Sequence, residues 1–466
     1  MPKRYDGLLL VAFGGPEGLD DVEPFLARVT SGRSIPADRL AEVADRYRSV
    51  GGRSPLNGRM RTLRDAIRAE LDRRGLDVPV FWGNRNADPL LADAVAAMSN
   101  AGVRRALAWT ASPYASYETC RRYGENLEAA QTAVGPGAPV IDRVRRHHDH
   151  PGLINPAADR LVEALDRLPA NRRDRAHLLF SAHSIPTALA DTCAYVAQLR
   201  DTARLVAERV DPEHRHDHEV VWQSRSGSPQ VPWLEPDVGD RIQALAATGV
   251  DAVAVSPIGF PVENFEIAWD LDVEASGRAA DAGVAFTRAE AVDDDPRFVS
   301  MVVDLLVERL GHDPEPIRSG LGSLGVPVDA CSKTCCPGPA PDRYRPAEYP
   351  RTPVDRQVIS VVMNHARIAS EALRFRLGTF STPIGGSPAL DPEEAGAILV
   401  ACGDPGVDHA LRMVGQTWQQ AGLIPETIEQ PWSAGDAARM RSVGGVALLD
   451  ALDDLVSGIS RCRILS

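Results

Sequence analysis

Three groups of polar residues in this sequence follow apolar runs and could take part in chemistry. The first contains His183, which lies between the apolar run Leu178–Phe180 and the helix-breaking Pro186. A histidine at the end of a buried strand can act as a general base or bind a metal ion. A single histidine at such a position more often has a structural role. His183 is therefore a candidate only together with its neighbours.

The second group is acidic. Glu266, Asp270 and Glu274 are spaced four residues apart, so a helix would place them on one face. Like charges at this spacing repel by roughly a few tenths of a kcal/mol per pair, whereas a row of carboxylates can carry a hard cation or pass protons. A solvated outer helix face is the alternative interpretation. The position of the stripe, directly after Gly259-Phe-Pro261 at a predicted strand end, favours a site.

The third group combines polar and aromatic residues. Trp222-Gln-Ser-Arg-Ser-Gly227 again follows a short apolar run and leads to Trp233-Leu-Glu-Pro236. These residues would suit a flat aromatic ligand, and ordinary loop packing explains them equally well.

Cysteines form a further cluster. Three of the seven cysteines, Cys331, Cys335 and Cys336, lie close together in the sequence. We find no secretory signal, so a disulfide framework is not expected. A structural zinc site or free thiols are two interpretations that remain open.

The composition limits the classes of function. The chain has 466 residues, a net charge of −13 and 44% hydrophobic residues, which is typical of a globular protein with two or three domains. The negative charge argues against binding to nucleic acid. The first apolar run, Gly7–Phe13, is too short to span a membrane and does not resemble a signal peptide. We therefore expect no membrane span and a cytoplasmic protein.

One segment differs from the acidic average. Residues 28–64 contain nine arginines and three acidic residues. This excess of positive charge could bind an anionic ligand, and an exposed helix face explains it equally well.

The elements that would position these groups alternate between strands and helices. Runs of leucine, alanine and β-branched residues predict strands at residues 8–13, 79–82, 105–110, 176–181, 219–222 and 252–256. Helix-like segments between them indicate an α/β protein with buried parallel strands. We expect two doubly wound halves, Rossmann-like or flavodoxin-like, that bind ligands just beyond the carboxyl ends of their strands.

The predicted halves are residues 1–150 and 151–315. A helix from about Asp295 to Leu310 closes the second half, because Asp295 suits an N-cap and Gly311 a helix end. Residues 316–356 are rich in proline and glycine and form a predicted linker with the cysteine cluster. Residues 357–466 are expected to be a C-terminal α/β-like extension of unassigned function.

The motifs make the sequence similar to ferrochelatases. Phe180-Ser-Ala-His183-Ser-Ile-Pro186 resembles the histidine signature of that family, and Gly259 to Glu274 resembles its acidic helix. The segments Ala12-Phe-Gly-Gly-Pro16, Gly51-Gly-Arg-Ser-Pro55 and Gln223-Ser-Arg-Ser-Gly227 with Trp233-Leu-Glu-Pro236 also resemble family motifs. The motifs follow the family's order, and the resemblance covers residues 1 to about 345. It is greatest to the coproporphyrin III ferrochelatases of actinobacteria.

The resemblance implies a type II chelatase, a lyase of heme biosynthesis that inserts Fe²⁺ into coproporphyrin III or protoporphyrin IX. It implies that His183 and Glu266 are catalytic and meet the iron, and that Asp270 and Glu274 form a path for the metal. Five residues would hold the porphyrin propionates: Arg33, Arg46, Tyr47, Ser54 and Tyr123. The implied partners are porphyrin and Fe²⁺, and other heme-pathway enzymes are further candidates.

The resemblance also gives the cysteines a third interpretation. Many ferrochelatases hold a 2Fe–2S cluster with cysteines near the C-terminal end of the catalytic region, and thiolates are the usual ligands of such clusters. Cys331, Cys335 and Cys336 would then be ligands, with Cys120 as the fourth. Cys193 or His216 could replace Cys120. The adjacent pair Cys335 and Cys336 departs from the expected spacing.

Two other positions depart from the family pattern. Phe13 stands where some members have a metal-binding tyrosine, so a ligand from that side chain is excluded. Asn264 stands where others have a histidine. Two other functions remain open, namely a non-catalytic tetrapyrrole carrier and a chelatase for another metal or a sirohydrochlorin-type ring.

Overall fold

The computed structural model describes residues 5–31, 37–227, 230–310, 317–331 and 335–338, all of which belong to one compact unit, residues 1–344. Arg33 and the predicted extension 357–466 lie outside the described residues. Within the described part, no helix combines the length and the apolar character needed to cross a bilayer.

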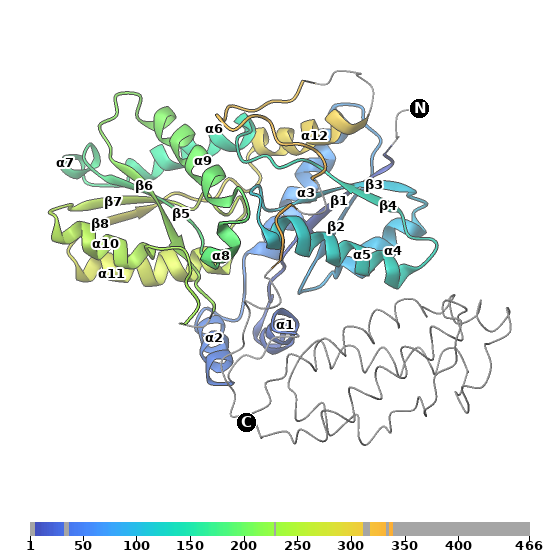
Figure 1. The fold of residues 1–466 in the computed structure, drawn as a ribbon, viewed down its shortest axis with the longest axis horizontal. Helices are drawn as coiled ribbons and strands as arrows, with labels where there is room; N and C mark the ends of the chain where they lie inside the picture. Colours follow the sequence, from blue (N-terminus) through green and yellow to red (C-terminus); the bar gives the residue numbers. More distant parts are fainter. Residues whose placement is uncertain (1–4, 32–36, 228–229, 311–316, 332–334, 339–466) are drawn as a thin grey trace, which may run out of the picture. The chain divides into compact units, whose positions relative to one another are not determined.

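Two parallel sheets of four strands each form the framework (Figure 1). The first has the order β2-β1-β3-β4 and the second the order β6-β5-β7-β8, so the same winding occurs twice. The strands are β1 Gly7–Ala12, β2 Val80–Asn84, β3 Arg105–Thr110, β4 Val140–Arg143, β5 His177–His183, β6 His218–Gln223, β7 Ala252–Ser256 and β8 Ala285–Arg288. The predicted α/β fold with two doubly wound halves is confirmed.

Each central strand is apolar on both faces because helices cover both sides of its sheet. Side chains alternate along a strand, so Leu8 and Leu10 of β1 point into one core and Leu9 and Val11 into another. The first of these cores also contains Leu178 and Phe180 of β5. The two sheets therefore share one hydrophobic core.

The helices fall into groups according to the core that they cover. Helices α3, α6, α9 and α12 supply the shared core, α4 and α5 cover the other face of the first sheet, and α10, η3 and α11 cover that of the second. The helices of the first half are η1 Leu19–Asp21, α1 Val22–Val29, α2 Ala37–Ser49, α3 Leu56–Arg73, α4 Leu91–Asn100, η2 Tyr117–Arg122 and α5 Tyr123–Val134. Those that follow are α6 Pro151–Leu165, α7 Ala170–Arg173, α8 Thr187–Ala190, α9 Tyr195–Val210, α10 Val238–Ala247, η3 Ile267–Ala275, α11 Ser276–Asp281 and α12 Pro296–Leu310.

The last helix ties the two sheets together. α12 packs against α6 and also against α3, which covers the first sheet. Arg74, just after α3, pairs with Asp304 at 2.6 Å and bonds Ser300, both in α12. The boundary that we predicted at residue 150 remains a prediction, since residues 5–310 pack as parts of one unit.

Three local features differ from the expectations. The edge strands β4 and β8 were not predicted, because each has only four residues and is partly exposed. Asp270 and Glu274 of the acidic stripe lie on a π-helix, η3, rather than on an α-helix, and Glu266 is the N-cap of this π-helix. His183 is the last residue of β5 rather than part of the following loop.

Candidate active site

The predicted polar groups meet at the carboxyl end of the second sheet. His183 ends β5, and Gln223, its neighbour in the parallel register, ends β6. β7 lies on the other side of β5 and leads into the loop before η3. Parallel strands bring their carboxyl ends to one edge of the sheet, where doubly wound folds bind ligands.

The imidazole of His183 is held in one orientation. Its Nδ1 lies 2.5 Å from the carbonyl oxygen of Ser184, and since a carbonyl only accepts, Nδ1 carries the proton. In the neutral ring the lone pair is then on Nε2, which lies 3.6 Å from Oε1 of Glu266. Tyr195 fixes the backbone by donating from its hydroxyl to the carbonyl of His183 at 2.9 Å.

A glycine brings Glu266 to this histidine. The amide of Gly259 donates to the carbonyl of Ser181 at 3.0 Å, so the loop after β7 lies directly on the end of β5. A Cβ atom on Gly259 would be 2.6 Å from both Cα and Cβ of Ala182. Only glycine permits this approach, which starts η3 beside His183.

Asp270 is the buried member of the acidic stripe. Its pKa is raised to about 7, mainly by burial and further by the charges of Glu266 and Glu274, while the hydrogen bond from Ser224 opposes the shift. A carboxyl with this pKa exists in both protonation states near neutral pH. π-Helical turns are uncommon and are often found at functional sites.

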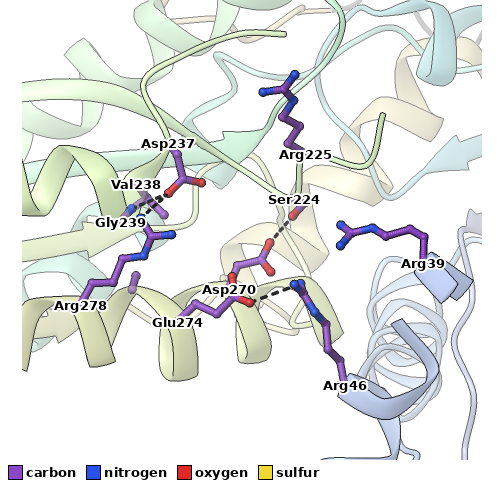
Figure 2. Close-up of a pocket in the computed structure, with 11 residues that line it drawn as sticks. Arg39, Arg46, Ser224, Arg225, Asp237, Val238, Gly239, Asp270, Glu274 and Arg278 are labelled. Carbon is purple, nitrogen blue, oxygen red and sulfur yellow. Dashed lines mark hydrogen bonds and ion pairs between the residues drawn. The ribbon is translucent and has the colours of Figure 1, made fainter. Parts of the chain in front are cut away.

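Two residues of the Trp222–Gly227 segment support Asp270, a role that we did not predict. The hydroxyl of Ser224 donates to Oδ2 of Asp270 at 2.5 Å (Figure 2). The amide of Gln223 donates to the carbonyl of Glu266 at 3.1 Å and to Oδ2 of Asp270 at 3.4 Å. Ser224 has a φ of +60°, a strained value for a residue with a side chain. The sequence feature that could have pointed to Gln223 and Ser224 is their position at the end of a predicted strand.

Aromatic rings connect the first half to η3. The ring of Tyr47 stacks on Phe265 with centroids 3.7 Å apart, and Phe265 stacks in turn on Trp269. Tyr47 is buried, and burial together with the charges of Glu266 and Asp270 raises its pKa. Arg46 lies over the ring of Trp269 and pairs with Glu274 at 3.3 Å. Of the predicted propionate residues, Arg46 therefore contacts η3 itself, and Tyr47 contacts Phe265 just before it.

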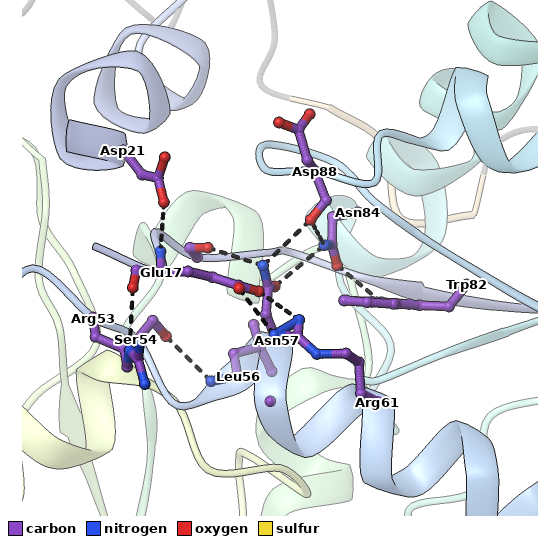
Figure 3. A network of polar contacts seen from close by, with 12 residues as sticks. Glu17, Asp21, Arg53, Ser54, Leu56, Asn57, Arg61, Trp82, Asn84 and Asp88 are labelled. Atoms are coloured by element: carbon purple, nitrogen blue, oxygen red, sulfur yellow. Dashed lines mark hydrogen bonds and ion pairs between the residues drawn. The ribbon is translucent and has the colours of Figure 1, made fainter. Parts of the chain in front are cut away.

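Ser54 lies in a buried network that joins the two N-terminal motifs (Figure 3). Its backbone amide donates to the carbonyl of Pro16 at 2.8 Å, and its hydroxyl accepts from the amide of Leu56 at 3.4 Å. A Cβ atom on Gly15 would be 2.5 Å from the Cβ atom of Ser54. Close packing against Ser54 thus requires glycine at position 15.

Tyr123 and Phe13 lie at different depths. Tyr123 is buried in the core formed with α4 and α5, and burial raises its pKa. Phe13 follows β1, is partly exposed, contacts Phe25 edge-on and lies under the guanidinium of Arg85.

The four predicted cluster cysteines are linked by pairwise contacts. The thiols of Cys335 and Cys336 are 3.7 Å apart. The Cys336 thiol donates to Cys120, which lowers the pKa of Cys120, and Cys331 is hydrogen-bonded to Cys335. No three His, Cys, Asp or Glu side chains among the described residues are arranged as a metal site.

The alternative ligands lie in different places. Cys193 donates to the carbonyl of Leu189 at 3.3 Å and is close enough to Cys120 and Cys335 for their charges to raise its pKa, although burial is the larger cause. The ring of His216 bonds the carbonyl of Ala176 at 2.7 Å.

A cavity of about 130 Å³ lies at the outer end of the stripe and is lined by Ser224, Asp270, Glu274 and several arginines (Figure 2). Liquid water takes about 30 Å³ per molecule. The cavity is therefore large enough for several water molecules or a hydrated ion.

Comparisons with known proteins show which family the chain belongs to. A family model described as ferrochelatase matches residues 5–310. A coproporphyrin III ferrochelatase from Streptomyces coelicolor is 46% identical over 360 residues, which cover 74% of this chain and 95% of that protein. One from Nocardia farcinica is 47% identical over 354 residues, covering 73% and 98%. The solved structure of CbiX, the terminal enzyme of siroheme biosynthesis in denitrifying bacteria, aligns with 65% of this chain at 13% identity and a TM-score of 0.37. The chain belongs to the ferrochelatase family of enzymes.

Proposed function

We propose that this enzyme inserts Fe²⁺ into coproporphyrin III, the substrate for which its bacterial relatives are named. The observation that carries the proposal is the pairing of His183 with Glu266 at the carboxyl end of β5, where Nε2 of His183 lies 3.6 Å from the carboxylate.

Metal insertion requires the removal of two pyrrole protons and of the water bound to Fe²⁺. In our proposal the Nε2 lone pair of His183 accepts a pyrrole proton or binds iron briefly. The carboxylate of Glu266 attracts the cation to the same place and stabilises the imidazolium once it forms.

Asp270 and Glu274 would continue this path outward. Asp270, with its pKa of about 7, can take up and release a proton at neutral pH without a large free-energy cost. Glu274 lines the outer cavity, where Fe²⁺ would arrive in hydrated form.

The propionates would be held by Arg33, Arg46, Tyr47, Ser54 and Tyr123. Arg46 supports this assignment best, because its guanidinium is partly exposed and can bind a carboxylate in bidentate fashion. The hydroxyls of Tyr47, Ser54 and Tyr123 are more deeply placed and would contribute hydrogen bonds after local rearrangement.

The experiment is a parallel insertion assay. Coproporphyrin III, protoporphyrin IX and sirohydrochlorin are each supplied with Fe²⁺ or Co²⁺ to the wild-type enzyme and to His183→Ala. We expect coproporphyrin III with Fe²⁺ to react fastest, because its four propionates meet an arginine-rich segment. His183→Ala should bind porphyrin but not metallate it. A preference for sirohydrochlorin, or near-normal turnover by His183→Ala, contradicts the proposal.

We propose further that Cys120, Cys331, Cys335 and Cys336 hold a 2Fe–2S cluster. The supporting observation is the charge beside them. The guanidinium of Arg146 is buried and bonds Thr110 and Ser112. Burial lowers its pKa, whereas Cys120, Cys331 and Cys336 lie close enough to raise it once they carry a thiolate charge. A buried cation needs an anionic partner, and a 2Fe–2S core, with its two bridging sulfides, carries net negative charge when four thiolates bind it. Such a cluster would supply one-electron redox chemistry and a covalent tie between residues far apart in sequence.

The colour of the protein tests this second proposal. Anaerobically purified enzyme should be reddish-brown with visible charge-transfer absorption, and Cys335→Ser should be colourless and less stable, since bound metal contributes to the free energy of folding. Colourless wild-type protein that contains zinc, or no metal, would contradict the cluster and leave the chelatase assignment intact.

A further inference from the structure

Arg46 has two acidic partners and one aromatic partner at the mouth of the outer cavity. One of its terminal nitrogens lies 2.9 Å from Glu42 on α2, and the other lies 3.3 Å from Oε1 of Glu274 on η3. The guanidinium carbon is 5.7 Å from the ring centroid of Trp269. Arg46 therefore joins a helix of the first half directly to the acidic stripe (Figure 2).

The carboxylate of Glu274 already has two partners in this arrangement. The same Oε1 atom that faces Arg46 accepts a hydrogen bond from the indole N–H of Trp269 at 2.7 Å. A carboxylate attracts a divalent cation through its negative charge, and an adjacent guanidinium weakens that attraction. In this arrangement Glu274 is a poor first ligand for Fe²⁺.

We propose that Arg46 couples the binding of the two substrates by exchanging one carboxylate for another. Without porphyrin it pairs with Glu274; when porphyrin binds, a propionate takes the guanidinium and Glu274 becomes free to receive Fe²⁺. This inference rests on the propionate role proposed above for Arg46. Metal uptake would then follow porphyrin binding, and hydrated iron would not be held at an empty site.

The exchange must act in both directions. Because Glu274 and the propionate compete for one guanidinium, whatever removes the charge of Glu274 must strengthen porphyrin binding. In this proposal Glu274 therefore weakens porphyrin binding, because it occupies the guanidinium that the propionate needs.

The first experiment measures the Kd of coproporphyrin III by fluorescence quenching without metal. Glu274→Gln should lower the Kd by about two- to five-fold, the range expected for loss of a partly exposed ion pair, and Arg46→Gln should raise it. In the double variant, Glu274→Gln should have no further effect, since the competition has been removed.

Asp272→Asn is the matched control. Asp272 lies on the same helix and pairs with Arg288 at 2.7 Å, not with Arg46. Its substitution removes the same charge, so an equal gain in affinity for Asp272→Asn and Glu274→Gln would mean general repulsion and would overturn the coupling. An unchanged or weaker affinity in Glu274→Gln would overturn it as well.

The second experiment measures Mn²⁺ binding by electron paramagnetic resonance, with and without zinc coproporphyrin III, whose centre is already filled. Wild-type enzyme should bind Mn²⁺ more tightly when the porphyrin is present, and Arg46→Gln should bind it equally in both states. If Arg46→Gln does not weaken porphyrin binding, the propionate role of Arg46 fails and the coupling fails with it. If Arg46→Gln weakens porphyrin binding but Mn²⁺ binds wild-type enzyme equally in both states, the coupling alone fails.

Discussion

Glu266 and Glu274 lie on one helix but have different neighbours. Glu266 faces the free nitrogen of His183, whereas Glu274 is held by Trp269 and Arg46. We expect Glu266→Gln to lower kcat by about 10²- to 10⁴-fold, the range typical of groups that take part in acid–base catalysis, because the imidazolium of His183 loses its carboxylate partner. Glu274→Gln should have a much smaller effect. Steady-state insertion rates, with thermal melting as the folding control, measure the difference. Mild and equal losses at both positions would instead indicate a solvated helix face.

Asp270 makes the stability of the protein depend on pH in a defined window. Its pKa of about 7 lies above the unfolded value of about 3.9. The folded state therefore binds more protons between these values, and the free energy of unfolding contributed by Asp270 falls as pH rises through the window. Asp270→Asn removes this titration, so its stability relative to wild type should rise from pH 4 to pH 7.

Urea unfolding of wild type and Asp270→Asn between pH 4 and pH 7 measures this change in relative stability. The difference between them should change by at most about 1.4 kcal/mol per pH unit, the limit for one proton. A difference that stays constant with pH would show that Asp270 is ionised throughout.

The element that sets the His183–Glu266 distance is the loop after β7. Gly259→Ala introduces a methyl group 2.6 Å from Ala182, so the loop must move away from β5. Overpacking of this kind costs about 1–3 kcal/mol, and here it should also separate Glu266 from His183 and lower kcat. Gly277→Ala is the control, because its Cβ atom would meet nothing within 4 Å. Equal behaviour of the two variants would contradict the role of Gly259.

The elements differ in how far the sequence could reveal them. Central strands such as β3 and β7 were predicted at their observed residues, because burial on both faces selects continuous apolar runs. The edge strands β4 and β8 carry polar residues such as Asp142 and Arg288 and lack this signal. The π-helical geometry of η3 was not predictable, because a spacing of four residues also fits an α-helix.

The candidate site was predictable in part for a similar reason. A residue at a strand end, such as His183, can be placed at the edge of the sheet once its strand has been predicted. The partners of Asp270 and Arg46 depend on tertiary packing: Ser224 reaches Asp270 from another strand, and Glu274 reaches Arg46 from the other half. Local sequence contains no information on these distances.

At the scale of the whole molecule, buried histidines lie in the segment that connects the first sheet to α6. His150 caps α6 by accepting from the amide of Gly152 at 3.0 Å, and burial, together with the charge of Arg145, lowers its pKa to about 4. The unfolded state, with a pKa of about 6.5, binds more protons below that pH, so stability is lost as pH falls from about 6.5 to 4.

His150→Asn keeps an acceptor for the cap and removes the titration. We expect this variant to lose less stability than wild type on acidification, by up to about 1.4 kcal/mol per pH unit. Thermal melting between pH 7 and 4.5 measures it, and exposed His214→Asn is the control. If both variants and the wild type lose stability in parallel, the acid sensitivity arises elsewhere.

The packing of α12 against α3 affects how the protein is made. Translation completes α3 long before α12 exists, yet Met60, Leu63 and Ile67 of α3 belong to the same core as Phe298 and Leu305 of α12. Until about residue 310 has left the ribosome, the nascent first half exposes apolar surface that no earlier segment covers. Such surface is what chaperones bind and what drives aggregation of incomplete chains. Folding of this enzyme is therefore completed only after synthesis of its second half, although the first sheet comes entirely from residues made earlier.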